Sequence, residues 1–411
     1  MQDLLDQASG LLEDAIQLRR SIHAEPELGL QLPGTQAKVL TALEGLPLEL
    51  LTGQRTTSIV ADLRGRRSGP VVLLRADMDA LPLQEETGLA YASQRPGAMH
   101  ACGHDAHTAM LVGAARLLAR RQADLAGSVR FMFQPGEEGY GGARVMLDEG
   151  LLDDQPTAAF ALHATPRWPA GTIATRSGPV LASADAFSIT IRGRGGHAST
   201  PHVVADPVPV ACEVVLALQS FMTRTVSIFE PGVLTVANVE AGTTHNIIPD
   251  AARLRGTVRT LAPATRNHIR EGIRRVARGV AEAHGLSAEV EFEPGYPVTV
   301  NDPDAARLAL DTGRQLLGAE RACEQPTPQM AAEDFSFVLE QVPGAMISLG
   351  TRPSGLDEHE APPGHSTRYL LEEGAMTTGI AMYAALALGV LERGSDWKSM
   401  SGESRRPGKT N

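Results

Sequence analysis

The chain has 411 residues, of which 43% are apolar and 21% are charged, a composition typical of globular proteins and unlike that of disordered or fibrous ones. Its length favours two domains over a single hydrophobic core. The formal net charge of −11 argues against a nucleic acid or an anionic membrane as partner, because both are bound by basic surfaces, and a small-molecule substrate is the expectation.

The cysteine content and the start of the chain indicate the compartment. Cys102, Cys212 and Cys323 are few and far apart, which fits a reducing environment better than a disulfide framework. The opening stretch MQDLLDQASGLLEDAIQLRR is acidic and amphipathic, unlike a secretory signal. We find no stretch of about 18 apolar residues that is able to span a bilayer. A cytoplasmic protein is therefore expected.

The first half of the chain alternates strand and helix patterns. Strands are predicted at residues 70–77, 128–135 and 158–164, and helices at residues 105–121 and 143–149. Nearly continuous apolar strands of this kind are typical of a sheet covered by helices on both faces. The fold class predicted is α/β, with a mixed sheet.

The pattern changes near Ala182. The expected order becomes strand, helix, two strands, helix and strand, at residues 184–195, 206–222, 232–242, 251–260, 263–284 and 287–293. This is the split βαβ order of a small ferredoxin-like α+β domain. We expect it to be an insertion over 183–293 that divides a larger, discontinuous domain into 1–182 and 294–394. A disordered tail is expected over 395–411, where the sequence is polar and rich in Ser and Gly.

The stretch MHACGHDAH, residues 99–107, concentrates ligand-type side chains at a predicted strand-to-helix junction. Cys102 and His104 are placed to aim a thiolate and an imidazole at one point, and both groups bind zinc or a similar divalent metal. The alternative is a small buried cysteine beside surface histidines.

Other polar residues lie at the ends of predicted strands, where α/β sheets build their sites. Glu137 and Glu138 are adjacent in FQPGEEGYGG, so that one carboxylate can bind a metal while the other accepts a proton from water. A solvated acidic turn is the alternative. His163 is predicted to end its strand, and His365 lies on a loop before the last predicted helix.

The segment LLRADMDALP adds Asp77 and Asp79 just past a buried strand. Buried carboxylates need partners, and a supporting role toward a histidine or a metal is expected. The alternative for these carboxylates is an ion pair with Arg75.

Two residues of the predicted insertion carry a possible catalytic role. His197 lies in GRGGHAS and Asn246 in GTTHNIIPD. Both side chains can donate a hydrogen bond to a developing oxyanion if the insertion folds over the site.

Seven motifs together resemble the M20 metallopeptidases, specifically the branch with aminoacylases, hippurate hydrolases and plant indole-acetyl-amino-acid hydrolases. The motifs are RADMDALP, HACGHDAH, FQPGEEG, GRGGHAS, HNIIPD, EDFS and HSTR, and the resemblance extends to about Arg393. It implies a discontinuous zinc-peptidase-like catalytic domain with an inserted domain that serves as lid and dimerisation domain. The implied metal ligands are Cys102, His104, Glu138, His163 and His365.

The resemblance further implies two divalent ions per subunit (Zn, Mn, Co or Ni), Glu137 as general base and a homodimer in which His197 assists the transition state. We expect hydrolysis of the amide bond of N-acyl-L-amino acids, with Arg259 of GTVRT as a candidate partner for the substrate carboxylate. Three alternatives stay open: a thiol hydrolase with Cys102 as nucleophile activated by His104 or His107, a metallo-dipeptidase or carboxypeptidase of the same fold, and a non-catalytic metal-binding scaffold.

Overall fold

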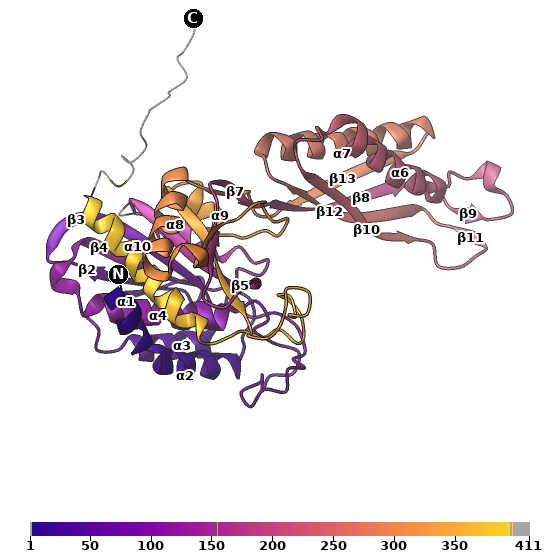
Figure 1. The fold of residues 1–411 in the computed structure, drawn as a ribbon. Helices are drawn as coiled ribbons and strands as arrows, with labels where there is room; N and C mark the ends of the chain where they lie inside the picture. Colours follow the sequence, from indigo (N-terminus) through magenta and orange to yellow (C-terminus); the bar gives the residue numbers. More distant parts are fainter. Residues whose placement is uncertain (1, 154, 395–396, 398–411) are drawn as a thin grey trace, which may run out of the picture. The chain divides into compact units, whose positions relative to one another are not determined.

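A computed structural model describes residues 2–153, 155–394 and 397. The chain divides into two compact units (Figure 1). The first comprises residues up to Val180, Val300–Thr327 and the residues from Asp334 onward, and the second comprises Leu181–Thr299 and Pro328–Glu333. The predicted tail, residues 395–411, lies outside the described residues except for Trp397.

A mixed sheet forms the centre of the first unit. Among the described residues it has eight strands in the order β1-β2-β4-β3-β5-β16-β6-β15. Their bounds are β1 Glu49–Thr52, β2 Ile59–Arg64, β3 Arg67–Asp77, β4 Ala126–Gln134, β5 Ala158–Pro169, β6 Ile173–Thr175, β15 Ala322–Glu324 and β16 Gly344–Arg352. The central strands β4, β3, β5 and β16 run parallel, whereas β1, β2 and the β16–β6 pair are antiparallel. The predicted α/β class with a mixed sheet is confirmed.

Helices pack on this sheet in layers. Helices α4, α8 and α10 contact its central strands, and α1, α2 and α3 lie outside α4 and α10 (Figure 1). The helix bounds are α1 Gln2–Ser9, α2 Leu12–His23, α3 Pro33–Leu43, α4 His104–Ala119, α5 Gly142–Asp148, α8 Pro303–Leu317, α9 Ser336–Leu339 and α10 Ala375–Arg393. Helix α4 is buried over most of its length because it has the sheet on one side and α2 and α3 on the other.

Helix α10 corrects the expectation that no stretch of the sequence is long and apolar enough to span a bilayer. By length and composition it is apolar enough to cross a membrane. Its side chains are instead buried in the core of the first unit, where Tyr383, Ile380 and Leu386 are inaccessible to solvent. An interior helix becomes apolar all round when it is covered on every side.

The second unit contains its own hydrophobic core. Its sheet has the antiparallel order β10-β12-β8-β13, which is the ferredoxin-like arrangement, and α6 and α7 cover one face (Figure 1). The bounds are β8 Ser183–Arg192, α6 Pro207–Thr225, β10 Gly232–Ala241, β12 Ala251–Thr260, α7 Pro263–Ala283 and β13 Ser287–Pro294. Shorter pairs are formed by β9 Gly196–His197 with β11 Ile247–Ile248, and by β7 Gly178–Leu181 with β14 Thr299–Asn301.

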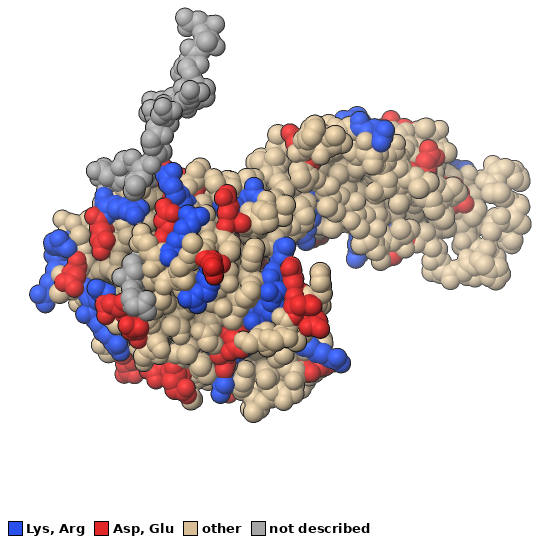
Figure 2. Space-filling view, in the orientation of Figure 1, with Lys and Arg blue, Asp and Glu red and all other residues tan. Residues whose placement is uncertain are grey.

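Charged side chains are distributed without a single-sign field on the visible face of the first unit. Figure 2 shows Lys and Arg interspersed with Asp and Glu there. Such mixing is typical of the surfaces of globular proteins.

Candidate metal centre

Cys102 and His104 lie on either side of a tight turn into α4. Between them, Gly103 has φ 87° and precedes the first residue of the helix. A Cβ atom at this position would lie 3.0 Å from the Cβ atom of Ala164, so both the backbone angle and the space favour glycine. The turn directs the cysteine and the histidine side chains toward one region at the edge of the sheet.

Glu137 and Glu138 follow β4 in a second tight turn, where Gly136 has φ 73°. The side chain of Asp79 holds this turn, because its two carboxylate oxygens accept hydrogen bonds from the backbone N–H groups of Glu137 at 2.9 Å and Glu138 at 3.0 Å. Glu137 is only 5% exposed. The alternative of a solvated acidic turn therefore does not describe this pair.

His163 lies inside β5 rather than at its end, which corrects the prediction from the sequence. The strand continues to Pro169 because β16 pairs with it beyond the histidine, through Gly350 opposite Thr165. The Nε2 atom of His163 lies 3.4 Å from the Sγ atom of Cys102.

His365 lies on the loop between β16 and α10, as expected. Its backbone N–H donates a hydrogen bond of 2.8 Å to the carbonyl of Ala101, which joins this loop to the Cys102 turn. The Nε2 atom of His365 lies 3.3 Å from the Oε1 atom of Glu138. Despite a sequence separation of hundreds of residues, the loop therefore reaches the same cluster.

The five predicted ligands fall into overlapping groups of donor atoms. Cys102, His104 and His163 form one group, and Cys102, Glu138 and His365 form another, with the donor atoms of each group within 4.8 Å of one another. Glu137 joins His104 and Glu138 in a third group. Because Cys102 belongs to two groups, the arrangement offers adjacent positions for two ions.

The hydrogen bonds of two histidines fit this donor set. The Nδ1 atoms of His104 and His163 face the backbone carbonyls of Asp79 and Ala164 at 2.8 Å, and a carbonyl only accepts, so each proton is assigned to Nδ1. The Nε2 lone pairs then face the cluster. The Nε2 atom of His104 and the Oε1 atom of Glu138 are buried without a hydrogen-bond partner, as expected of atoms placed to bind a cation.

Buried charges surround the cluster. Asp77 accepts a hydrogen bond of 2.6 Å from the Nδ1 atom of His107 and pairs with Arg75 at 2.7 Å, so the ion pair considered from the sequence coexists with a supporting role. Burial raises the pKa of Asp77, but Arg75 and the nearby histidines outweigh it and hold the pKa well below the usual range. In His104, burial is outweighed by Asp77 and Cys102, which raise the pKa well above its ordinary value. The surroundings of the donor cluster therefore favour the binding of positively charged groups.

The pKa values of two other members bear on the alternatives. Burial lowers the pKa of His163 to about 3, which keeps the ring neutral, the form that binds metals. Burial raises the pKa of the Cys102 thiol to about 12, against the influence of His104. A nucleophilic cysteine has a lowered pKa, so this environment does not favour the thiol hydrolase.

The remaining predicted residues belong to the second unit. His197 and Asn246 lie side by side there, because the backbone N–H of Ala198 donates to the carbonyl of Asn246 at 3.1 Å and β9 pairs with β11. The backbone N–H of Ser199 donates to the Nδ1 atom of His197, which assigns the ring proton to Nε2 as a donor. Arg259 is a half-buried residue of β12, and burial lowers its pKa.

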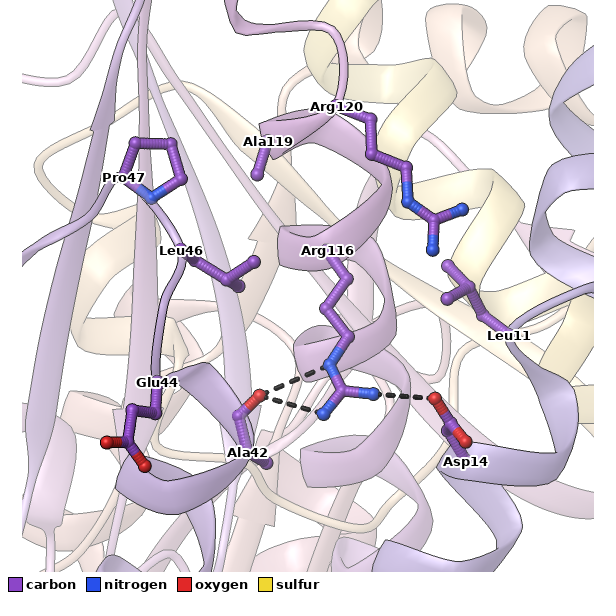
Figure 3. Close-up of a pocket in the computed structure, with 9 residues that line it drawn as sticks. All are labelled: Leu11, Asp14, Ala42, Glu44, Leu46, Pro47, Arg116, Ala119 and Arg120. Carbon is purple, nitrogen blue, oxygen red and sulfur yellow. Dashed lines mark hydrogen bonds and ion pairs between the residues drawn. The ribbon is translucent and has the colours of Figure 1, made fainter.

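A surface pocket of about 420 Å³ lies elsewhere in the first unit, at the far end of α4 (Figure 3). Its central arginine, Arg116, is bound to Asp14 at 2.9 Å and to the carbonyl of Ala42. None of the predicted site residues lines this pocket.

Sequence reasoning missed several supporting residues. The sequence suggests for His107 only the role of activating a thiol. In the structure, its Nδ1 atom donates a hydrogen bond to Asp77 and its Nε2 atom accepts one from the backbone N–H of Ala164. Its position three residues after His104 places both on one face of α4 and was a usable signal. Asp334, in EDFS, binds Arg75 and Gln134, and nothing in local sequence indicates that contact.

Comparison with known proteins decides the family. The family model described as peptidase family M20/M25/M40 matches residues 73–389. The chain belongs to this family. It is 40% identical over 378 residues to the N-acetylcysteine deacetylase of Bacillus subtilis (strain 168), covering 92% of this chain and 97% of that protein.

Other M20 relatives span a range of named activities. Thermostable carboxypeptidase 1 of Saccharolobus solfataricus is 37% identical, with 91% of this chain and 94% of that protein covered. The IAA-amino acid hydrolase ILR1-like 4 of Arabidopsis thaliana is 36% identical, with 90% and 84% covered. Among solved structures, the YXEP protein of Bacillus subtilis, described as a dinuclear metal binding peptidase of the M20 family, has a TM-score of 0.81 and 37% identity, covering 93% of this chain and 99% of that one.

Proposed function

We propose that this M20 protein is an amidohydrolase that cleaves the amide bond of N-acyl-L-amino acids, using two divalent metal ions. The observation that carries the proposal is the set of overlapping donor groups that share Cys102. A scaffold that only bound metal would not need a further buried carboxylate, Glu137, beside the ligands.

The proposed ligands are Cys102, His104, Glu138, His163 and His365. Thiolate and imidazole donors with one carboxylate suit Zn²⁺ and its neighbours in the first transition series, including Mn, Co and Ni. When bound, a pair of such ions makes a water a stronger acid and polarises the scissile carbonyl.

The protein's own residues then carry the proton and the charge. Glu137 accepts the proton of the attacking water and delivers it to the leaving amine. Asp79 fixes the position of this base, because its carboxylate holds the backbone of the Glu137 turn. Asp77 keeps Arg75 and His107 in place behind the ligands.

We also propose catalytic roles for three residues of the second unit. His197, with its Nε2 proton, and Asn246 donate hydrogen bonds to the oxyanion of the tetrahedral intermediate. Arg259 binds the carboxylate of the amino-acid part. This role is supported by the half-buried position of the Arg259 guanidinium. A carboxylate bound there would replace the water that the guanidinium loses on burial.

We also propose a homodimer formed through the second unit, in a cytoplasmic setting. Strand β10 is an edge strand, and Ile228 and Phe229 just before it are each 88% exposed. An edge strand beside exposed apolar side chains is suited to symmetric pairing. The three cysteines are free, which supports a reducing compartment.

A substrate panel with controlled metal content tests this function. We expect the chelated protein to be inactive, and added zinc, manganese, cobalt or nickel to restore hydrolysis of N-acetyl, benzoyl or indole-acetyl amino acids in preference to dipeptides and carboxypeptidase substrates. Iodoacetamide tests the alternative of a thiol hydrolase. Under our proposal, bound metal should protect Cys102 from alkylation. Full activity without metal, or inactivation by iodoacetamide with all metal retained, would overturn the proposal.

A further inference from the structure

Helix α2 carries buried charges that the proposed reaction does not use. Arg19 and His23, four residues apart on one face, are 2% and 1% exposed. Fully buried ionisable side chains are uncommon unless they are paired, so their partners indicate what they hold in place.

The partners form a line of alternating charge. One carboxylate oxygen of Asp105 lies 3.0 Å from the Nε atom of Arg19 and 2.8 Å from the Nδ1 atom of His23. The other ring nitrogen of His23 lies 3.2 Å from Glu85. On the other side, Arg19 binds Glu373 at 2.7 Å, and Arg20 binds the same carboxylate at 2.6 Å.

One part of this line fixes the start of α4. Asp105 directly follows His104 in the first turn of the helix and is fully buried. A rotation or shift of that turn would move both residues together. The contacts from α2 to Asp105 therefore restrain the position of the His104 ring.

The other parts hold the segment that follows His365 in its loop. Glu86, next to Glu85, donates its backbone N–H to the carbonyl of Thr367 at 2.8 Å. Glu373 lies farther along the same segment, just before α10. His365 itself has φ 64°, an unfavourable angle for a residue other than glycine, and such a conformation persists only where the surroundings enforce it.

We propose that Arg19 and His23 of α2 are positioning residues for the metal centre. They join the turn of His104 to the loop of His365 through Asp105, Glu85 and Glu373, so that the two histidines are held at the spacing that two ions require. This inference rests on the proposed metal site.

The test measures cobalt binding to the full-length, metal-free protein. Arg19→Met removes the charge that Asp105 and Glu373 share, and we expect the Kd for Co²⁺ to rise by about tenfold or more, the range known for residues that orient ligands. Arg19→Lys should recover most of this affinity because it retains the cation. Glu373→Gln, which preserves size, should weaken binding in the same direction and covers the case in which Arg19→Met does not fold.

Arg116→Gln is the matched control. Arg116 also joins α4 to α2, through Asp14, but at the opposite end of α4 (Figure 3). Its Kd for Co²⁺ should equal that of the wild type. The visible absorption of bound Co²⁺ provides a second readout, because it reports ligand geometry: it should change in Glu373→Gln and stay unchanged in the control, with all variants showing native circular dichroism.

The outcomes separate the two proposals. Wild-type affinity and spectrum in both Arg19→Met and Glu373→Gln would overturn the positioning role and leave the metal site standing. Equal weakening in Arg116→Gln would overturn it as well, because a general loss of stability would then explain the effect. A wild-type protein that binds no Co²⁺ would overturn the metal site and this inference together.

Discussion

At the scale of single residues, Glu137 and Glu138 have different surroundings although they are adjacent. Asp79 holds the backbone of both, but Glu138 faces His365 and His104, whereas Glu137 is the more deeply buried. The proposed division of labour, with Glu138 as ligand and Glu137 as base, follows from these surroundings.

Glu137→Gln tests this assignment. The amide preserves size but does not accept the proton of water, so we expect kcat to fall by about two orders of magnitude or more while two metal ions remain bound. Metal analysis and steady-state rates on one preparation provide the measurement. Activity within tenfold of the wild type would show that the base is another group. Loss of one metal ion would show that the two glutamates have been assigned in the wrong order.

The identity of the cluster's members could be predicted residue by residue, because each lies in a short motif. Cys102 and His104 share one turn, and the two glutamates share another. Their supporting contacts could not be predicted. Asp334 reaches Arg75 across the fold, and Asp79 holds the glutamate turn through backbone N–H groups, which leave no trace in the side-chain pattern.

At the scale of elements, strands and helices with strong periodicity were predicted within a few residues. Strand β3, helix α4 and the order of elements in the second unit are examples. Strand β5 was predicted too short because its last part is stabilised by pairing with β16, a tertiary contact. No role is predicted for α2 from the sequence, because the pattern does not reveal that Arg19 and His23 are buried beside Ala15 and Ile22.

The charges on α2 predict how stability depends on pH. Burial lowers the pKa of His23, but the hydrogen bond with Asp105 outweighs it and raises the pKa to about 9. The unfolded value is about 6.5, so the protonated ring stabilises the folded protein fully below about pH 6.5, and this contribution is lost as the pH rises through about 9. The groups that face the ring are Asp105, Glu85, Arg19, Tyr91 and His100.

The measurement compares urea unfolding of the wild type and His23→Gln between pH 6.5 and 9.5. The wild type should lose more stability than the variant over this window, by on the order of 2 to 3 kcal/mol. Parallel pH profiles for the two proteins would contradict the raised pKa of His23.

At the scale of the whole molecule, complementation between inactive variants tests whether two subunits share the proposed catalytic residues. We predict that His197 acts in the site of the neighbouring subunit of the dimer. Inactive His197→Ala protein and inactive Glu137→Gln protein are mixed under conditions that exchange subunits. Each mixed dimer then has one intact site, so activity should rise to about a quarter of the wild type for random exchange.

Two controls make this experiment decisive. Exchange is confirmed by mass spectrometry of a tagged subunit, and each variant is also mixed with itself. With exchange confirmed, activity that stays at the level of the separate variants would contradict the supply of His197 between subunits.

The division of the first unit into separate stretches of sequence sets the order in which the protein is assembled during translation. Cys102, His104, Glu138 and His163 leave the ribosome before the second unit, and His365 leaves after it. The second unit has its own core, whereas the first lacks β16 and α10 until the second unit has been synthesised. The nascent chain therefore presents an incomplete set of the proposed ligands, and the proposed metal centre is completed only after His365 has left the ribosome.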